Sequence, residues 1–187
     1  CVRLHDQGCG MKGRVFRVVG PSGAGKDTLL AGAVAADPRL HWARRVITRP
    51  SVAGGEPFEG VSEAVFQARL QAGDFALHWQ AHGLCYGVPL AQLKPLDDGR
   101  DVLINGSRAA VAAALLAFPG LRLIQISAPL AVLADRLAAR GRESHGDILA
   151  RLRRADHALP EGVAAIEIRN DASAEQGIAR LLHALRA

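Results

Sequence analysis

Cysteine and methionine are scarce in this 187-residue sequence, and long apolar runs are absent from it. The 3 cysteines, Cys1, Cys9 and Cys85, have unrelated spacings, which argues against a disulfide framework or a zinc cluster. No segment reaches the roughly 18 consecutive apolar residues of a membrane span, and residues 1–12 lack the apolar centre of a signal peptide. We therefore expect a cytoplasmic protein with no membrane partner.

The hydrophobic content of 49% is enough for one full core at this length. We expect a single domain over residues 13–187. Residues 1–12 are expected to form a disordered N-terminal extension, since Met11 is the only methionine. The formal net charge of +5 favours an anionic partner, which at this point is either a nucleotide or a nucleic acid.

Short apolar strands alternate with helical segments along the chain. Strands are predicted over 15–19, 44–47, 102–104, 121–127 and 164–168, and a hairpin over 75–79 and 84–88. Helices are predicted over 27–36, 62–71, 109–117, 129–140, 147–157 and 174–185. This alternation predicts an α/β fold of three layers, with a mostly parallel sheet and right-handed crossovers.

The segment from Gly20 to Thr28 fits the phosphate-binding pattern G-x-x-x-x-G-K, and it lies between a predicted strand and a predicted helix. Backbone N–H groups of such a loop point at a phosphate, the helix dipole favours negative charge there, and Lys26 can reach the β and γ phosphates. A glycine turn that merely links strand to helix is the alternative. The residues expected to bind ATP are Gly20, Pro21, Ser22, Gly23, Ala24, Gly25, Lys26, Asp27 and Thr28.

Asp27 occupies the position that normally holds Ser or Thr as a magnesium ligand. A carboxylate oxygen is a suitable hard ligand for Mg²⁺, so Asp27 is the predicted metal ligand. Thr28 could serve instead if the loop shifts. Asp27 could also be only an acidic first-turn residue favoured by the helix dipole.

These motifs, taken in order, resemble the guanylate kinase family over most of residues 14–186. Ile47 to Pro50 with Glu56 resembles the family's substrate-phosphate loop, Tyr86-Gly87 its hairpin tyrosine, and residues 136–142 with Arg151 its arginine lid. The resemblance implies a P-loop kinase fold with a small substrate-side flap over about 49–88 and a lid over about 140–150. It also places Asn170 in the loop beside the adenine.

The resemblance gives the lid arginines a catalytic role next to Lys26, because their charge can offset negative charge on the transferring phosphoryl group. These arginines are Arg136, Arg140 and Arg151. A solvated basic helix is the alternative. An RNA-binding patch is disfavoured because no aromatic residues are interleaved there, so we expect no nucleic-acid partner.

Two departures from the family pattern concern the acceptor. The positions that contact guanine in the family correspond to His78 and Val88 in this sequence. Neither residue can replace the family's glutamate. The strand end that in the family usually carries an Asp for magnesium has Asn105 here. Asp27 in the glycine-rich loop would then supply the missing carboxylate ligand. His78, His82 and Cys85 could form a metal cluster, but strand alternation and the lack of a fourth ligand favour a polar lining for a sugar or a surface position.

The P-loop ending in Lys26-Asp27, the segment Ile47-Thr48-Arg49 and the segment Asn105 to Arg108 together resemble one branch, the ribose 1,5-bisphosphate phosphokinases of phosphonate catabolism. The resemblance implies Mg²⁺-dependent transfer from ATP to ribose 1,5-bisphosphate, a phosphorylated sugar, to give 5-phosphoribosyl 1-diphosphate. The residues expected to bind this substrate are Arg49, Glu56, His78, Tyr86 and Arg108. The alternatives are a nucleoside monophosphate kinase such as guanylate kinase, and an interaction module of that fold without catalysis.

Overall fold

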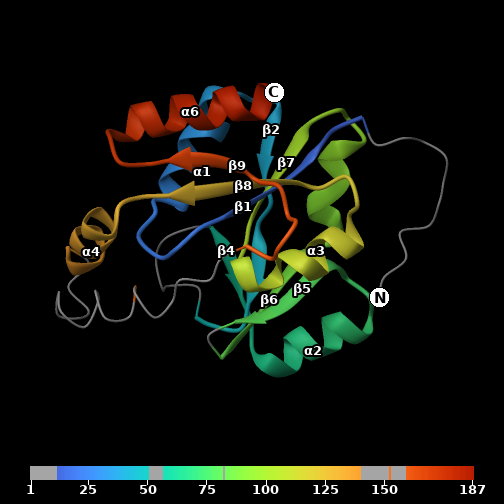
Figure 1. Ribbon diagram of the computed structural model, residues 1–187. Helices are drawn as coiled ribbons and strands as arrows, with labels where there is room; N and C mark the ends of the chain where they lie inside the picture. Colours follow the sequence, from blue (N-terminus) through green and yellow to red (C-terminus); the bar gives the residue numbers. More distant parts are fainter. Residues whose placement is uncertain (1–11, 51–56, 82, 140–151, 153–158) are drawn as a thin grey trace.

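Five parallel strands form the central sheet of the computed structural model, which describes residues 12–50, 57–81, 83–139, 152 and 159–187 (Figure 1). Their order is β2-β7-β1-β8-β9, with β1 at the centre. All pairings in this sheet are parallel, which confirms the predicted α/β class. The strand bounds are Val15–Val19 (β1), Leu40–Trp42 (β2), Asp101–Asn105 (β7), Arg122–Ser127 (β8) and Ile166–Arg169 (β9).

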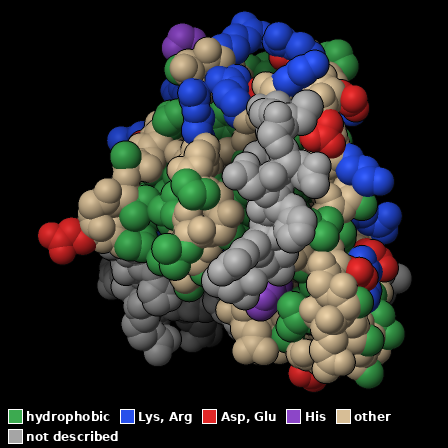
Figure 2. Space-filling model, turned by 90° about the vertical axis from the view of Figure 1, so that its right-hand side faces the viewer, with side chains coloured by type: hydrophobic (Ala, Val, Ile, Leu, Met, Phe, Trp, Pro, Cys, Tyr) green, Lys and Arg blue, Asp and Glu red, His purple; other side chains and the backbone are tan. Residues whose placement is uncertain are grey.

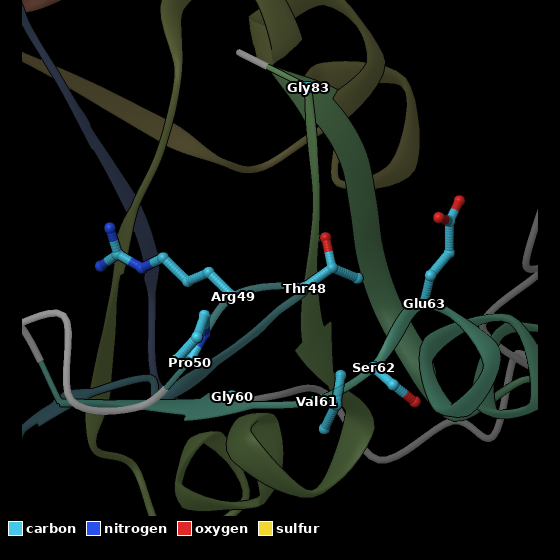
Figure 3. A pocket seen from close by; sticks show the side chains of 8 residues that line it. All are labelled: Thr48, Arg49, Pro50, Gly60, Val61, Ser62, Glu63 and Gly83. Atoms are coloured by element: carbon cyan, nitrogen blue, oxygen red, sulfur yellow. The ribbon is translucent and has the colours of Figure 1, made fainter.

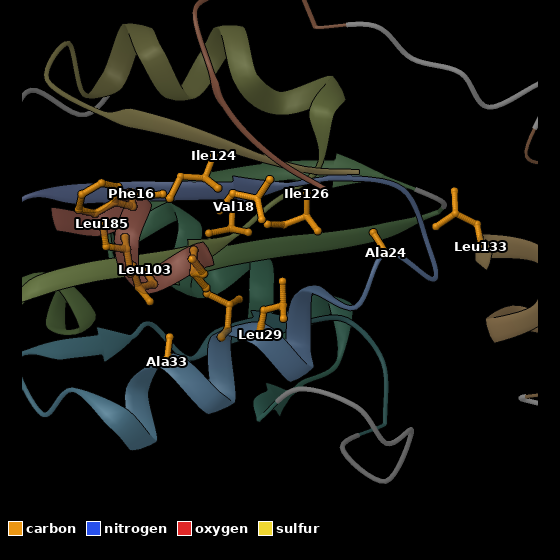
Figure 4. Close-up of a cluster of buried hydrophobic side chains, with 14 of the residues drawn as sticks. Phe16, Val18, Ala24, Leu29, Ala33, Leu103, Ile124, Ile126, Leu133 and Leu185 are labelled. Atoms are coloured by element: carbon orange, nitrogen blue, oxygen red, sulfur yellow. The ribbon is translucent and has the colours of Figure 1, made fainter. Parts of the chain in front are cut away.

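Helices cover both faces of this sheet, as a parallel sheet requires. On one face α1 (Lys26–Ala36) and α6 (Ala174–Arg186) enclose a cluster of buried apolar side chains, part of which is drawn in Figure 4. A Cβ on Gly32 would lie 2.2 Å from Ile178 Cδ1, so these two helices pack closely. On the other face, α3 (Val111–Ala117) and the 3-10 turn η3 (Arg108–Ala110) pack against a second cluster.

A second sheet lies against that second face, with strand order β4-β3-β6-β5. Its strands are β3 (Arg45–Ile47), β4 (Phe58–Gly60), β5 (Phe75–Ala81) and β6 (Leu84–Pro89), and α2 (Glu63–Gln71) joins β4 to β5. The β5–β6 pair is the antiparallel hairpin expected from the sequence. Ser62 caps α2, because its side chain accepts a hydrogen bond from the Val65 backbone N–H. This sheet occupies the segment predicted to be the substrate-side flap.

Three short elements were not predicted: β2, β4 and the 3-10 segment η2 (Leu90–Leu96). Strands of three residues carry little periodicity, so β2 and β4 were missed although β3, of the same length, was expected over 44–47; β2 is defined by its pairing with β7. The helix predicted over 129–140 is α4 (Leu130–Ala138). The helix predicted over 147–157 and the extension over 1–12 lie largely outside the described residues.

Figure 2 looks onto the edge where the parallel strands begin, and Lys and Arg side chains gather in the upper part of this face. Some of this charge is paired: Arg14 contacts Asp101 at 2.8 Å, and Arg39 contacts Asp37 at 2.8 Å. The side-chain hydrogen bond from Arg39 lowers the pKa of Asp37 to about 2. The basic side chains visible in this view therefore lie at the edge where the strands begin, whereas the glycine-rich loop follows the end of β1. In the described part of the chain, no helix has the length and apolar character needed to cross a membrane.

Candidate active site

The glycine-rich loop connects the end of β1 to the start of α1, where the strand-loop-helix pattern placed it. Gly23 and Gly25 have φ values of 84° and 86°, in the left-handed region that favours glycine. The ammonium group of Lys26 donates hydrogen bonds to the carbonyl oxygens of Gly20 (2.9 Å) and Pro21 (3.0 Å). The only cation of the motif is thus folded over the loop at a helix N-terminus, where an anion is stabilised.

Asp27 and Asn105 meet beside this loop. The Asn105 side-chain amide donates a hydrogen bond to Asp27 Oδ1 at 2.8 Å, although 78 positions separate the two residues. Thr28 is exposed. Gly25 is the N-cap of α1 and makes no side-chain cap, so Asp27 lies within the first turn rather than capping the helix. A carboxylate next to an amide is a donor set that suits Mg²⁺ bound mainly by phosphates.

No cluster of three or more His, Cys, Asp or Glu side chains suited to a metal occurs among the described residues. This is compatible with magnesium sites in kinases, which use one or two protein ligands together with substrate phosphates and water. Of the three residues considered as a metal cluster, His78, His82 and Cys85, His82 lies outside the described residues.

Asn170, which follows β9, holds the glycine-rich loop in place. Its buried side-chain amide donates to the Ala24 carbonyl at 2.7 Å, and its backbone N–H donates to the Ser127 carbonyl at 2.7 Å. A Cβ on Gly25 would lie 2.6 Å from Asn170 Nδ2, so this contact requires glycine in the loop. Asn170 therefore supports the loop backbone directly.

Arg136 of α4 also reaches this corner. Its guanidinium donates to the Asn170 carbonyl at 3.0 Å, and a Cβ on Gly25 would lie 3.9 Å from Arg136 Nη1. One of the predicted lid arginines is thus beside the phosphate-binding loop. Arg140 and Arg151 lie outside the described residues, so the lid itself stays a prediction.

A pocket of about 460 Å³ opens where β3 ends and α2 begins (Figure 3). Arg49 lies on its wall, with its guanidinium 4.3 Å from the centre of the Phe58 ring. The Nε of Arg49 is buried, and among the described residues it has no hydrogen-bond partner. The lining residues come from three segments of the flap: Thr48, Arg49, Pro50, Gly60, Val61, Ser62, Glu63 and Gly83.

The remaining predicted substrate residues are dispersed. Tyr86 is half-buried and stacks on Trp79, with ring centres 5.4 Å apart and planes at 3°. His78 is exposed on β5, whereas its neighbours Leu77 and Trp79 are buried against the second core cluster. Arg108 is half-buried in η3. Glu56 lies outside the described residues, so its role stays a prediction, as do those of the other four.

Sequence reasoning missed two arginines on the flap side of the sheet. Arg17 in β1 is fully buried, and its guanidinium carbon lies 4.6 Å from the centre of the Trp79 ring. Burial, reinforced by nearby Arg45, lowers the pKa of Arg17 to about 10. Arg45 lies over Tyr86 at 5.2 Å and over Trp79 at 5.7 Å. A charged residue inside the apolar run Val15–Val19 was the available signal for Arg17.

The parallel sheet and the glycine-rich loop define a P-loop fold of the kind found in guanylate kinases. A guanylate kinase from Anaplasma phagocytophilum superposes with a TM-score of 0.65 over 93% of this chain and 85% of that protein, at 20% identity. An unliganded sugar kinase from Janibacter superposes with a TM-score of 0.51 at 21% identity, covering 93% of this chain and 95% of that one. At these identities the likeness concerns the fold alone.

Sequence relatives are more specific. A ribose 1,5-bisphosphate phosphokinase PhnN from Ruegeria is 53% identical over 152 residues, which cover 81% of this chain and 80% of the relative. Another from Rhizobium etli is 44% identical over 174 residues, covering 91% of this chain and 88% of the relative. The chain belongs to the ribose 1,5-bisphosphate phosphokinase family.

Some relatives are longer proteins. A bifunctional ribose 1,5-bisphosphokinase-thymidine phosphorylase from Azorhizobium caulinodans is 49% identical over 176 residues, but these cover 92% of this chain and only 25% of that protein. The chain therefore spans about a quarter of the bifunctional relative. A scan of family models gave no match.

Proposed function

We propose that this chain transfers the γ-phosphoryl group of ATP to the 1-phosphate of ribose 1,5-bisphosphate. An oxygen of the 1-phosphate forms a bond to the γ phosphorus, the bond to the bridging oxygen breaks, and ADP leaves with the electron pair. The product is 5-phosphoribosyl 1-diphosphate. The observation that carries the proposal is a phosphate-binding loop with Lys26 folded over it, in a chain whose relatives bear the name of this activity.

On the donor side, the loop from Gly20 to Thr28 holds the ATP phosphates and Lys26 supplies positive charge to them. Asn170 keeps the loop backbone in place. We assign it to the adenine side of the nucleotide. The predicted lid arginines, Arg136, Arg140 and Arg151, stabilise the charge that develops on the transferring group. Mg²⁺, when bound, supplies charge neutralisation at the phosphates, and Asp27 is the residue that would hold it, with Asn105 orienting the carboxylate.

On the acceptor side, we assign substrate binding to Arg49, Glu56, His78, Tyr86 and Arg108, with Arg49 the leading phosphate ligand. Its position on the pocket wall supports this role, as does its buried Nε, which has no hydrogen-bond partner in the part of the chain that the structure describes. ATP as donor and the free thiol of Cys85 favour a cytoplasmic setting.

Guanylate kinase activity is the competing function. A guanine-binding hairpin needs an acidic acceptor, but β5 and β6 contain no Asp or Glu. The inner face of this hairpin carries Leu77, Trp79 and Val88, which pack in the apolar cluster beside Tyr86. This favours an acceptor without a base.

The test is a direct comparison of acceptors. The protein is incubated with Mg-ATP and either ribose 1,5-bisphosphate or GMP, and products are identified by mass spectrometry. We expect ribose 1,5-bisphosphate to be preferred by roughly 10⁴ in kcat/KM, because a site without partners for guanine leaves its polar edge unpaired.

Other outcomes would overturn this assignment in distinct ways. A higher kcat/KM for GMP would make the chain a guanylate kinase. ATP binding without turnover of either acceptor would identify the non-catalytic interaction module. The Lys26→Ala variant is the control for contaminating kinases.

A further inference from the structure

Arg17 occupies an unusual place for a cation. It lies in the middle of the central strand, paired with Ile104 on one side and Leu123 on the other, and its side chain is 0% exposed. Its Nε, Nη1 and Nη2 atoms have no hydrogen-bond partner within the described part of the chain. The Trp79 ring is the contact that the structure gives this guanidinium, and a buried charge without hydrogen-bond partners is unfavourable, so its presence calls for a ligand or a function.

The guanidinium of Arg17 points toward the edge where ligands bind in parallel sheets. A Cβ on Gly106 would lie 2.5–2.7 Å from Nε, Cζ and Nη2, so the group rests against the residue that directly follows β7. In open parallel sheets, ligands bind beyond the carboxyl ends of the strands. Arg17 is therefore buried immediately beneath the ligand-binding edge.

Arg45 brings a second cation to the same place from the flap. Both guanidinium carbons lie within 6 Å of the centre of the Trp79 ring. Tyr86 pairs with Trp79 and with Ile47, and cross-strand partners share a face, so Tyr86 and Trp79 are on the sheet face that meets Arg17. Unlike Arg17, Arg45 and Tyr86 are only half-buried and can contact a ligand.

We propose that Arg17, Arg45, Trp79 and Tyr86 form a subsite for the second phosphate of the acceptor, the one that does not react. Arg45 contacts this phosphate, and Arg17 adds positive charge from beneath Trp79. The proposal rests on the proposed function, since only a bisphosphate has a second phosphate.

The burial of Arg17 decides which phosphate the subsite takes. The reacting phosphate must lie open to the γ-phosphoryl group above the glycine-rich loop, so a cation covered by Trp79 cannot serve it directly. The non-reacting phosphate has no such requirement. A buried charge acts strongly over about 10 Å because the surrounding medium screens it little.

The experiment crosses enzyme variants with substrates that differ by one phosphate. Ribose 1,5-bisphosphate and ribose 1-phosphate are assayed with the wild type, Arg17→Met, Arg17→Lys and Arg45→Gln. Ribose 1-phosphate is measured as a competitive inhibitor if its turnover is too slow. Arg122→Gln is the matched control. It also removes one positive charge, but from an exposed position at the start of β8, the end away from the ligand-binding edge of the sheet.

We expect Arg45→Gln to lower kcat/KM for the bisphosphate about 30-fold or more. Arg17→Met should lower it about tenfold, the effect of one charge about 10 Å away at an effective dielectric constant near 20. Neither change should alter the kcat/KM or inhibition constant of ribose 1-phosphate or the KM of ATP. Arg17→Lys should retain most of the activity with the bisphosphate. The Tm of Arg17→Met should not fall, since an apolar side chain replaces an unpaired buried charge.

The same assays distinguish an error in the subsite from an error in the proposed function. Suppose that the wild type phosphorylates the bisphosphate. If Arg17→Met and Arg45→Gln then weaken the use of both ribose substrates equally, or of neither, the subsite is wrong and the function stands. If the wild type does not phosphorylate ribose 1,5-bisphosphate, the subsite is wrong together with the function.

Discussion

The replacement Asp27→Asn distinguishes two roles of Asp27, that of a magnesium ligand and that of an acidic residue that stabilises the first turn of α1. Asn has nearly the same shape, and its amide oxygen can still accept the 2.8 Å hydrogen bond from Asn105. The substitution therefore removes the negative charge while the local packing is kept. If Asp27 is a ligand, the metal requirement of the enzyme must change.

The size of the effect follows from the loss of one charged partner. Interactions with a charged group contribute about 1.5–3 kcal/mol, which corresponds to about a 10- to 150-fold rise in the Mg²⁺ concentration for half-maximal rate. The assay is a titration of initial rate with free Mg²⁺ at saturating ATP and acceptor. ATP binding in excess chelator should stay close to that of the wild type.

Two controls make the test decisive. As a first-turn acid alone, Asp27 contributes about 0.3–1 kcal/mol to α1, so its loss would lower Tm by about 1–4 °C without moving the Mg²⁺ titration. The double variant Asp27→Ser with Asn105→Asp moves the carboxylate to the strand end and should recover much of the metal response that Asp27→Ser loses. Identical Mg²⁺ titrations for wild type and Asp27→Asn would refute the ligand role.

Two further predictions concern the cations on either side of the transfer. Lys26→Ala should lower kcat at least roughly 10²-fold while the far-UV circular dichroism spectrum stays unchanged, because its charge acts on phosphates rather than on the core; an unchanged rate would contradict the P-loop assignment. Arg49→Ala should raise the KM of the acceptor or lower kcat by about tenfold or more, with ATP affinity near wild type. Arg49→Lys is its control for charge alone, and a loss of ATP affinity in Arg49→Ala would argue against an acceptor role.

The site was predictable where its geometry is local. The Lys26 contacts lie within the loop, and a loop between a strand and a helix has one main way to present its N–H groups. The pairing of Asp27 with Asn105 was predictable in kind but not in geometry, since both residues stand out in the sequence but only the β1–β7 pairing brings them to 2.8 Å. The roles of Glu56, Arg140 and Arg151 stay predictions, because these residues lie outside the described part of the chain.

The sequence by itself determined the alternation of strands and helices, the position of the phosphate-binding loop and the β5–β6 hairpin, because each depends on short-range periodicity and turn chemistry. Tertiary structure alone decided the strand order, the short strands β2 and β4, and the exposure of His78, because these depend on which distant segments pair and pack. It also decided the position of Arg17. Whether a charge inside a strand lies in solvent or beneath an aromatic ring depends on the sheet that covers it, and here that sheet comes from residues 45–89.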